Sequence, residues 1–171
     1  IESCKWGLPN QDEVKICCDG SALGNPGEAG IGIIYRNNKG EVMGKYSKFI
    51  GQATNFITEI TSIISGVQKA VKQGWRRVWV VSDSATAIKA FIKDKIPWTL
   101  KTTWELIIPH LLQIRFSHVW EGMQLLGRSN YMDRVRPKPA SRRMDKWQTG
   151  ILTKYQRSCH RQLHSPEITL N

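Results

Sequence analysis

Three carboxylates fall at positions from which they could act together. Asp19 ends a stretch of alternating apolar residues, Glu59 lies in a segment with helical periodicity, and Asp83 ends a nearly all-apolar stretch. Carboxylates gathered at one place repel one another unless a cation lies between them. Such oxygen ligands suit Mg²⁺ or Mn²⁺, and two of these ions can activate water for phosphodiester hydrolysis. The same residues could instead begin a turn, face solvent and cap a helix, and their spacing alone leaves both interpretations open.

Five segments have the alternation or the apolar density that is typical of β-strands. They are residues 13–19, 29–36, 42–50, 76–83 and 114–121. Turn-forming residues over 20–30 and 37–41 join the first three, which predicts an antiparallel meander. If the first and fourth strands are neighbours, their ends place Asp19 and Asp83 together. We therefore expect an α/β fold, with a five-stranded mixed sheet, three antiparallel strands first, and helices on the sheet's faces.

Residues 53–73 repeat apolar side chains at helical spacing, which predicts an amphipathic helix. The members of this apolar stripe are Phe56, Ile60, Ile63, Ile64, Val67 and Val71. Thr54 is the expected N-cap and Gly74 the expected stop. Glu59 lies beside the stripe, so a helix packed across the sheet would bring its carboxylate toward the other two.

Two shorter helices are expected after the fourth strand. One covers residues 84–93, and the other lies within residues 97–109, between two prolines. Trp98 and Trp104 of the second helix could pack in the core or stack on nucleotides, and we expect core packing. His118, in the last strand, is expected to have a structural role.

The glycines that follow Asp19 raise the alternative of a phosphate-binding loop. They are Gly20, Gly24, Gly27, Gly30 and Gly32. A dinucleotide-binding loop requires G-x-G-x-x-G followed directly by a helix. Here the glycines lead into the strand-like residues 31–36, and the chain has no G-K-S/T sequence. The pattern therefore favours a turn followed by a strand, and the chemistry of this stretch resides in Asp19.

The formal net charge of +11 indicates an anionic partner such as nucleic acid. Much of this charge lies in residues 122–171, which hold ten Lys/Arg against three Asp/Glu and show no sustained periodicity. We expect residues 1–12 to be an N-terminal linker, residues 13–121 to be the folded domain, and residues 122–171 to be a disordered basic tail.

Several features indicate an intracellular protein without membrane association. No apolar run reaches the roughly 18 residues that a membrane span needs, and the first residues contain no signal-peptide core. The four cysteines, Cys4, Cys17, Cys18 and Cys159, form no C-x-x-C pair. We expect reduced thiols and a monomer, leave nucleus or cytoplasm open, and note that a start without Met is compatible with a fragment.

Four segments, in this order, resemble type 1 ribonuclease H domains, especially those of plant retroelements. They are DGSALGNPGEAGIGIIYRNNKGEV, TNFITEITSIISGVQKAV, VWVVSDSATAIKAF and IPWTLKTTWELIIPHLLQIRFSHVW. The resemblance implies an RNase H-like fold that cuts the RNA strand of RNA–DNA hybrids with two Mg²⁺ or Mn²⁺ ions. It also implies that Asp19, Glu59 and Asp83 are catalytic metal ligands, with Asp19 shared between the ions.

The chain departs from this family at the fourth metal-binding carboxylate. After the last strand the family has Arg-Glu-x-Asn-x-x-Ala-Asp, whereas this chain reads VWEGMQLLGRSNYMDRV. Asn130 and Asp133 imitate the pattern but come later. A one-base deletion near codon 123 would make the tail out-of-frame translation, and a divergent tail is the alternative.

Two other functions stay open at this point. One is a catalytically impaired module that binds nucleic acid through basic residues such as Lys45, Lys48, Arg76 and Arg77. The other is a decayed gene product without function.

Overall fold

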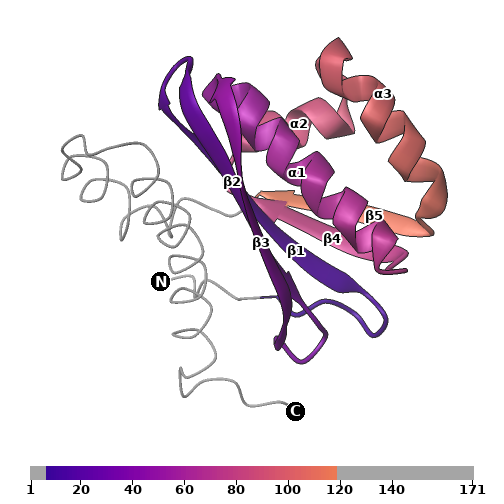
Figure 1. Ribbon diagram of the computed structural model, residues 1–171. Helices are drawn as coiled ribbons and strands as arrows, with labels where there is room; N and C mark the ends of the chain where they lie inside the picture. The colour runs from indigo at the N-terminus through magenta and orange to yellow at the C-terminus, as the bar shows by residue number, and fades with distance from the viewer. Residues whose placement is uncertain (1–6, 119–171) are drawn as a thin grey trace, which may run out of the picture.

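The computed structural model describes residues 7–118, in which five strands form one mixed sheet (Figure 1). The strands are β1 Val14–Gly24, β2 Gly27–Arg36, β3 Val42–Ala53, β4 Arg77–Ser82 and β5 Gln113–His118. Their order across the sheet is β3-β2-β1-β4-β5. β1 pairs with β2 antiparallel and with β4 parallel. The predicted α/β fold with an antiparallel meander is therefore confirmed.

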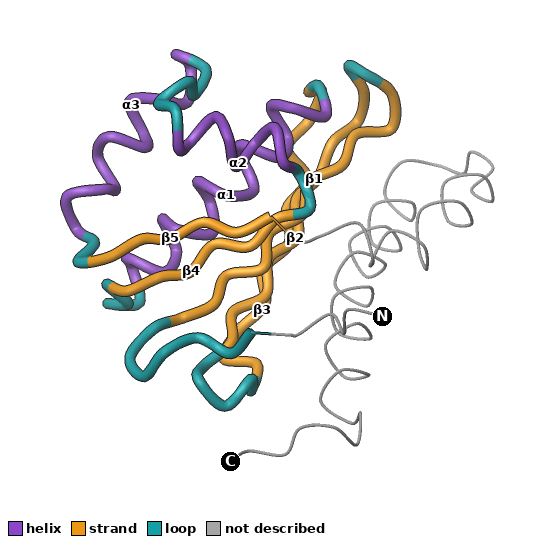
Figure 2. The backbone as a smooth tube through the Cα atoms, turned by 180° about the vertical axis from the view of Figure 1, so that it is seen from behind, coloured by secondary structure: helices purple, strands orange, loops and turns teal. Residues whose placement is uncertain are grey.

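Three α-helices cover one face of this sheet. They are α1 Asn55–Lys72, α2 Ala85–Ile92 and α3 Trp98–Ile107, and a 3₁₀ turn, η1 Ile108–His110, follows α3. Figures 1 and 2 show all three on the same side of the strands, with α1 lying across the middle. Among the described residues, the helices thus occupy one face of the sheet rather than both.

The long helix α1 begins and ends as predicted. The Thr54 side chain accepts a hydrogen bond from the backbone N–H of Ile57, and Gly74 has a positive φ of 80° beyond the last turn. Its apolar stripe packs on the sheet, with Ile60, Ile63, Ile64 and Val67 all buried. Phe56 is an exception at 36% exposure, because it lies in the first turn, before the buried part of the stripe.

The segment predicted as a long turn is mostly β-strand. β1 continues to Gly24 and β2 begins at Gly27, so the prediction for residues 20–30 was wrong. The connection itself requires glycine, because Gly24 has φ 110° and a side chain at Gly27 would collide with the carbonyl oxygen of Leu23. Residues of types that usually form turns are therefore part of two paired strands here, because the hydrogen bonds between the strands outweigh the weak strand propensity of these residues.

The two tryptophans predicted to pack in the core have different environments. Trp104 is buried and contacts Phe91 edge-on, with ring centroids 4.7 Å apart. Trp98 is 84% exposed at the start of α3, so the prediction for it was wrong. Ile96, which precedes the helix, is buried in its place and anchors the connection between α2 and α3.

Several sequence predictions fall on residues that the structure does not describe. The basic tail at 122–171 and its Asp133 lie outside the described residues, as do residues 1–6 of the predicted linker. Cys17 and Cys18 are buried thiols on adjacent positions of β1. None of the helices among residues 7–118 has the length and apolar character needed to cross a membrane.

A row of charged and aromatic side chains joins three strands on the sheet face away from the helices. Lys15 of β1, Trp79 of β4 and Arg115 of β5 are successive partners in the ladder. Both cations lie over the Trp79 ring, Lys15 at 4.3 Å and Arg115 at 3.8 Å from the centroid. Arg115 also binds both carboxylate oxygens of the buried Glu13, at 2.6 and 2.7 Å. This row ties the edge strand β5 to the centre of the sheet.

We predict that Glu13→Gln lowers the free energy of unfolding at neutral pH by about 1–2 kcal/mol, because it weakens the hydrogen bonds between a buried carboxylate and the partly exposed Arg115. The hydrogen bonds from Arg115 lower the pKa of Glu13 below its usual value. The stabilisation is therefore complete above the usual carboxyl pKa and is lost as pH falls through the lowered one. Urea unfolding of both proteins across acidic pH checks this.

The matched control is Glu41→Gln, which alters an exposed carboxylate bonded to Asn37. It should change the stability little. Equal unfolding free energies for Glu13→Gln and the unaltered protein at neutral pH would contradict the assignment, as would identical pH profiles.

Candidate metal centre

The structure brings the three predicted carboxylates together. One side-chain oxygen from each of Asp19, Glu59 and Asp83 lies within 4.8 Å of the others. Asp19 is 7% exposed, and the other two are half-buried. They come from β1, from the second turn of α1, and from the residue that follows β4. Three segments far apart in the sequence therefore meet at this cluster.

The parallel pairing of β1 and β4 places two of the carboxylates. Cys18 of β1 lies opposite Ser82 of β4, so the next residues along these strands, Asp19 and Asp83, come out side by side. Asp19 lies inside β1 rather than at its end, because β1 continues through the hairpin with β2. The prediction that Asp19 and Asp83 lie close together was right, whereas the prediction that Asp19 ends its strand was wrong.

A glycine allows the third carboxylate to reach the others. The backbone N–H of Gly20 donates a hydrogen bond to Oε2 of Glu59, at 3.2 Å. A Cβ atom at Gly20 would lie 2.6 Å from the carbonyl oxygen of Thr58 and 2.9 Å from the amide nitrogen of Glu59. Such distances are too short for real contacts, so β1 and α1 can cross this closely only at glycine.

Two asparagines fix the start of α1 against the hairpin. The side-chain oxygen of Asn55 accepts a hydrogen bond from the backbone N–H of Ala22, at 3.0 Å. The backbone N–H of Asn55 donates to the side-chain oxygen of Asn25 in the β1–β2 turn, at 3.1 Å. The glycine-rich stretch thus holds the helix that carries Glu59. Sequence reasoning missed both asparagines, whose only signals were a turn position and the first residue of a helix.

The joint between β4 and α2 holds Asp83. The Ser84 backbone N–H donates to the side-chain oxygen of Ser82, at 3.1 Å, and the Ser84 side chain caps α2 through Ala87. Nε2 of His118 in β5 lies 3.1 Å from the backbone carbonyl oxygen of Asp83. The backbone that carries the Asp83 carboxylate is therefore held both by the serines next to it and by His118 of β5.

The chemistry of the donor set favours a hard divalent cation. Burial raises the pKa of the Cys18 thiol well above its usual value, with a smaller contribution from the adjacent Cys17 and the nearby carboxylates. Cys18 therefore remains a neutral thiol, and the cluster offers oxygen ligands alone. Mg²⁺ and Mn²⁺ prefer such ligands, and a cation among three carboxylates removes their mutual repulsion. The residues present thus fit these ions.

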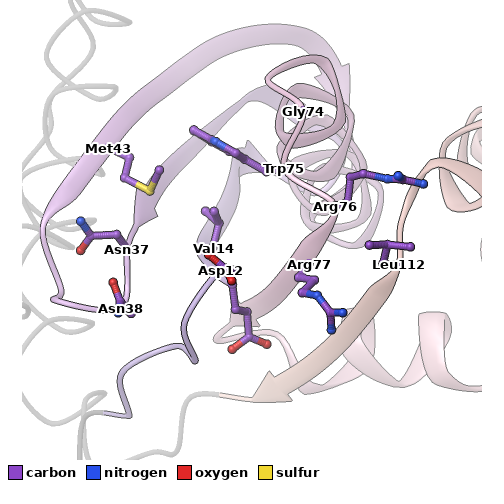
Figure 3. Close-up of a pocket in the computed structure, with 11 residues that line it drawn as sticks. Asp12, Val14, Asn37, Asn38, Met43, Gly74, Trp75, Arg76, Arg77 and Leu112 are labelled. Carbon is purple, nitrogen blue, oxygen red and sulfur yellow. The ribbon is translucent and has the colours of Figure 1, made fainter.

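The basic residues proposed for nucleic-acid binding lie at different places on the sheet. Lys45 and Lys48 are exposed on β3, whereas Arg76 and Arg77 lie at the beginning of β4, at the other end from Asp83. Figure 3 shows both arginines lining a separate pocket of about 430 Å³.

A comparison with known families identifies the fold. Residues 17–121 match the family described as "Reverse transcriptase-like", and this match covers more than half of the chain. The chain belongs to the reverse transcriptase-like family. The matched span includes all three carboxylates, most of β1 and the whole of the other four strands.

The curated relatives that resemble this chain include one ribonuclease. A ribonuclease HI of Haemophilus ducreyi is 33% identical over 104 residues, which cover 51% of this chain and 67% of the relative. A bifunctional protein of Mycobacterium tuberculosis is 30% identical over 103 residues, which cover 60% of this chain and 26% of the relative. The chain therefore spans about a quarter of the length of the mycobacterial relative.

Solved structures show the same architecture. The N-terminal RNase H domain of a Mycobacterium tuberculosis protein superposes with a TM-score of 0.58 at 25% identity, covering 66% of this chain and 91% of that one. LC11-RNase H1, solved in complex with an RNA/DNA hybrid, gives a TM-score of 0.54 at 28% identity and covers 62% and 84%. The RNase H-like fold is thereby confirmed.

We predict that Gly20→Ala lowers the free energy of unfolding by about 1–3 kcal/mol, because the added methyl group overpacks the contact between β1 and α1. It should also weaken Mn²⁺ binding, since α1 carries Glu59. Chemical unfolding and a calorimetric Mn²⁺ titration measure the two effects.

The control variant is Gly44→Ala in β3, where an added Cβ atom would lie 3.7 Å from the Tyr35 ring, an ordinary contact distance. This substitution should leave both quantities close to those of the unaltered protein. If Gly20→Ala behaves like Gly44→Ala, the close crossing does not constrain the site.

Proposed function

We propose that this chain hydrolyses the RNA strand of RNA–DNA hybrids as a ribonuclease H-type endoribonuclease. The observation that carries the proposal is the meeting of Asp19, Glu59 and Asp83 within 4.8 Å in a fold shared with ribonucleases H. The ribonuclease HI relative supports the same reaction class. An oxygen-only cluster is suited to the divalent ions that phosphodiester hydrolysis needs.

In this proposal the three carboxylates hold two Mg²⁺ or Mn²⁺ ions. Bound ions would supply an activated water and stabilise the leaving oxygen of the scissile phosphate. Asp19, the most buried of the three, would hold these ions together with Glu59 and Asp83. The bond from the Gly20 amide orients the Glu59 carboxylate, and the joint after β4 orients that of Asp83.

Two finer parts of the proposal rest on the sequence. The glycine-rich hairpin and the segment before the last strand resemble plant retroelement domains, so we propose a retroelement origin. Asp133 is the candidate for a fourth carboxylate, and it lies outside the described residues. If the tail is out-of-frame translation, the site would have three carboxylates instead of four.

The exposure of Trp98 supports a nucleic-acid partner. This ring is 84% exposed, whereas Ile96, two residues earlier, is buried. Four lysines flank it in the sequence: Lys89, Lys93, Lys95 and Lys101. Figures 1 and 2 place the α2–α3 connection at the same end of the molecule as the β1–β2 turn. An aromatic face among cations is a typical contact for bases and backbone phosphates.

The same observation favours a second candidate function, a nucleic-acid-binding module with impaired catalysis. Binding requires only the lysines and the tryptophan, whereas hydrolysis requires the complete ligand set. The two functions therefore differ in their dependence on the carboxylates.

We predict Mg²⁺- or Mn²⁺-dependent cleavage of a labelled RNA–DNA hybrid, reduced at least about 100-fold by Asp19→Asn, since a metal ion contributes several kcal/mol to the transition state. Gel analysis of the labelled RNA strand measures this. The substitution keeps the shape of the side chain, so loss of folding would not explain the effect. Equal cleavage by both proteins would contradict the assignment.

The same experiment separates the alternatives. Salt-sensitive hybrid binding without cleavage would support the binding module, because phosphate contacts release counterions. Absence of both binding and cleavage would support a decayed gene product.

We predict that Trp98→Ala weakens binding of the hybrid about tenfold, as expected for the loss of one stacked aromatic contact. Fluorescence anisotropy of labelled hybrid measures the dissociation constant. Leu106→Ala is the control, because Leu106 is also exposed on α3, at 69%. Equal affinities for the two variants would rule out a contact at Trp98.

A further inference from the structure

His118 connects the edge strand β5 to the backbone of a candidate metal ligand. It is the last residue of β5 and lies opposite Ser82 in the ladder with β4. It shares a face of β5 with Phe116, which packs against the core beneath the helices. From this face Nε2 of His118 comes within 3.1 Å of the Asp83 carbonyl oxygen. The ring is half-buried, so the contact is partly shielded from solvent.

The contact between His118 and the Asp83 backbone can influence where the Asp83 carboxylate lies. β4 ends at Ser82 and α2 begins at Ala85, so Asp83 belongs to neither element. The side-chain bonds of Ser82 and Ser84 fix the joint on the α2 side. The His118 ring holds the peptide group that follows Asp83 from the β5 side. Rotation of this peptide group would move the Asp83 side chain relative to the other two carboxylates.

We propose that His118 is a positioning residue for the metal centre and acts by holding the Asp83 backbone through its Nε2–H group. The inference rests on the proposed metal site formed by Asp19, Glu59 and Asp83. A carbonyl oxygen only accepts hydrogen bonds, so the His118 tautomer must carry its hydrogen on Nε2.

Repulsion among the carboxylates makes this support matter. Three such groups within 4.8 Å favour spreading apart when no cation is bound. Of the three carboxylates, Asp83 can move away most easily, because its backbone belongs to a two-residue connection rather than to a strand or a helix. Partners outside the ligand set typically change metal affinity 10- to 100-fold when they are removed. A residue that fixes the ligand's backbone is therefore expected to influence binding of the ion.

A calorimetric Mn²⁺ titration tests the role without depending on catalysis. We expect His118→Ala to weaken Mn²⁺ binding at least about tenfold. His118→Gln, which can offer an N–H group at a similar reach, should stay within about threefold of the unaltered protein. His110→Ala is the control, since His110 is exposed at the end of η1, before the end of β5 that pairs with Arg77 and lies away from the carboxylates. All titrations are run at one neutral pH and well below each variant's Tm.

A purely structural role predicts a different result. His118→Ala would then lower Tm and leave the Mn²⁺ affinity of the folded protein unchanged, which would overturn the inference. Failure of His118→Gln to restore binding would also count against the hydrogen bond. Failure of the unaltered protein to bind Mn²⁺ would overturn the metal centre and this inference together.

The hydrolysis proposal can be contradicted independently of the role of His118. If the unaltered protein binds Mn²⁺ but does not cut the hybrid, the ribonuclease assignment is wrong, and the affinities of the His118 variants still decide the positioning role.

Discussion

Mutual repulsion of three carboxylates is the constraint on which this site depends. Asp19, Glu59 and Asp83 are brought within 4.8 Å of one another, with Asp19 nearly buried. Such an arrangement opposes folding unless a cation or other favourable interactions offset the repulsion. The fold must therefore hold the three groups in place by interactions that are independent of the ion. A sheet ladder, a close helix crossing and a capped joint provide these interactions.

The close crossing of α1 over β1 links the core to the chemistry. Buried isoleucines of α1 fix the helix on the sheet, and Gly20 lets its backbone approach near Glu59. Asn25 and Asn55 then fix the first turn of the helix against the hairpin. Packing thus sets the distance between the elements, and hydrogen bonds set the direction of the carboxylate. The same helix therefore contributes both to stability and to the geometry of the site.

Local patterns in the sequence predicted much of this structure. Period-two alternation and apolar density located the strands, and Thr54 and Gly74 marked the ends of α1, because these signals depend on neighbouring residues. The strand character of residues 20–30 was missed, since pairing between strands overrides weak local propensity. The exposure of Trp98 and the contact of His118 with Asp83 were missed for a related reason. Both depend on segments distant in the sequence, which no local pattern specifies.

The most direct test of the metal centre is an anomalous-diffraction map from crystals grown with Mn²⁺. We predict one or two anomalous peaks within coordinating distance of the carboxylate oxygens of Asp19, Glu59 and Asp83. The peaks should be absent from crystals of Asp19→Asn grown under the same conditions. A map in which the three side chains are ordered but no anomalous peak lies among them would contradict the assignment of a metal centre.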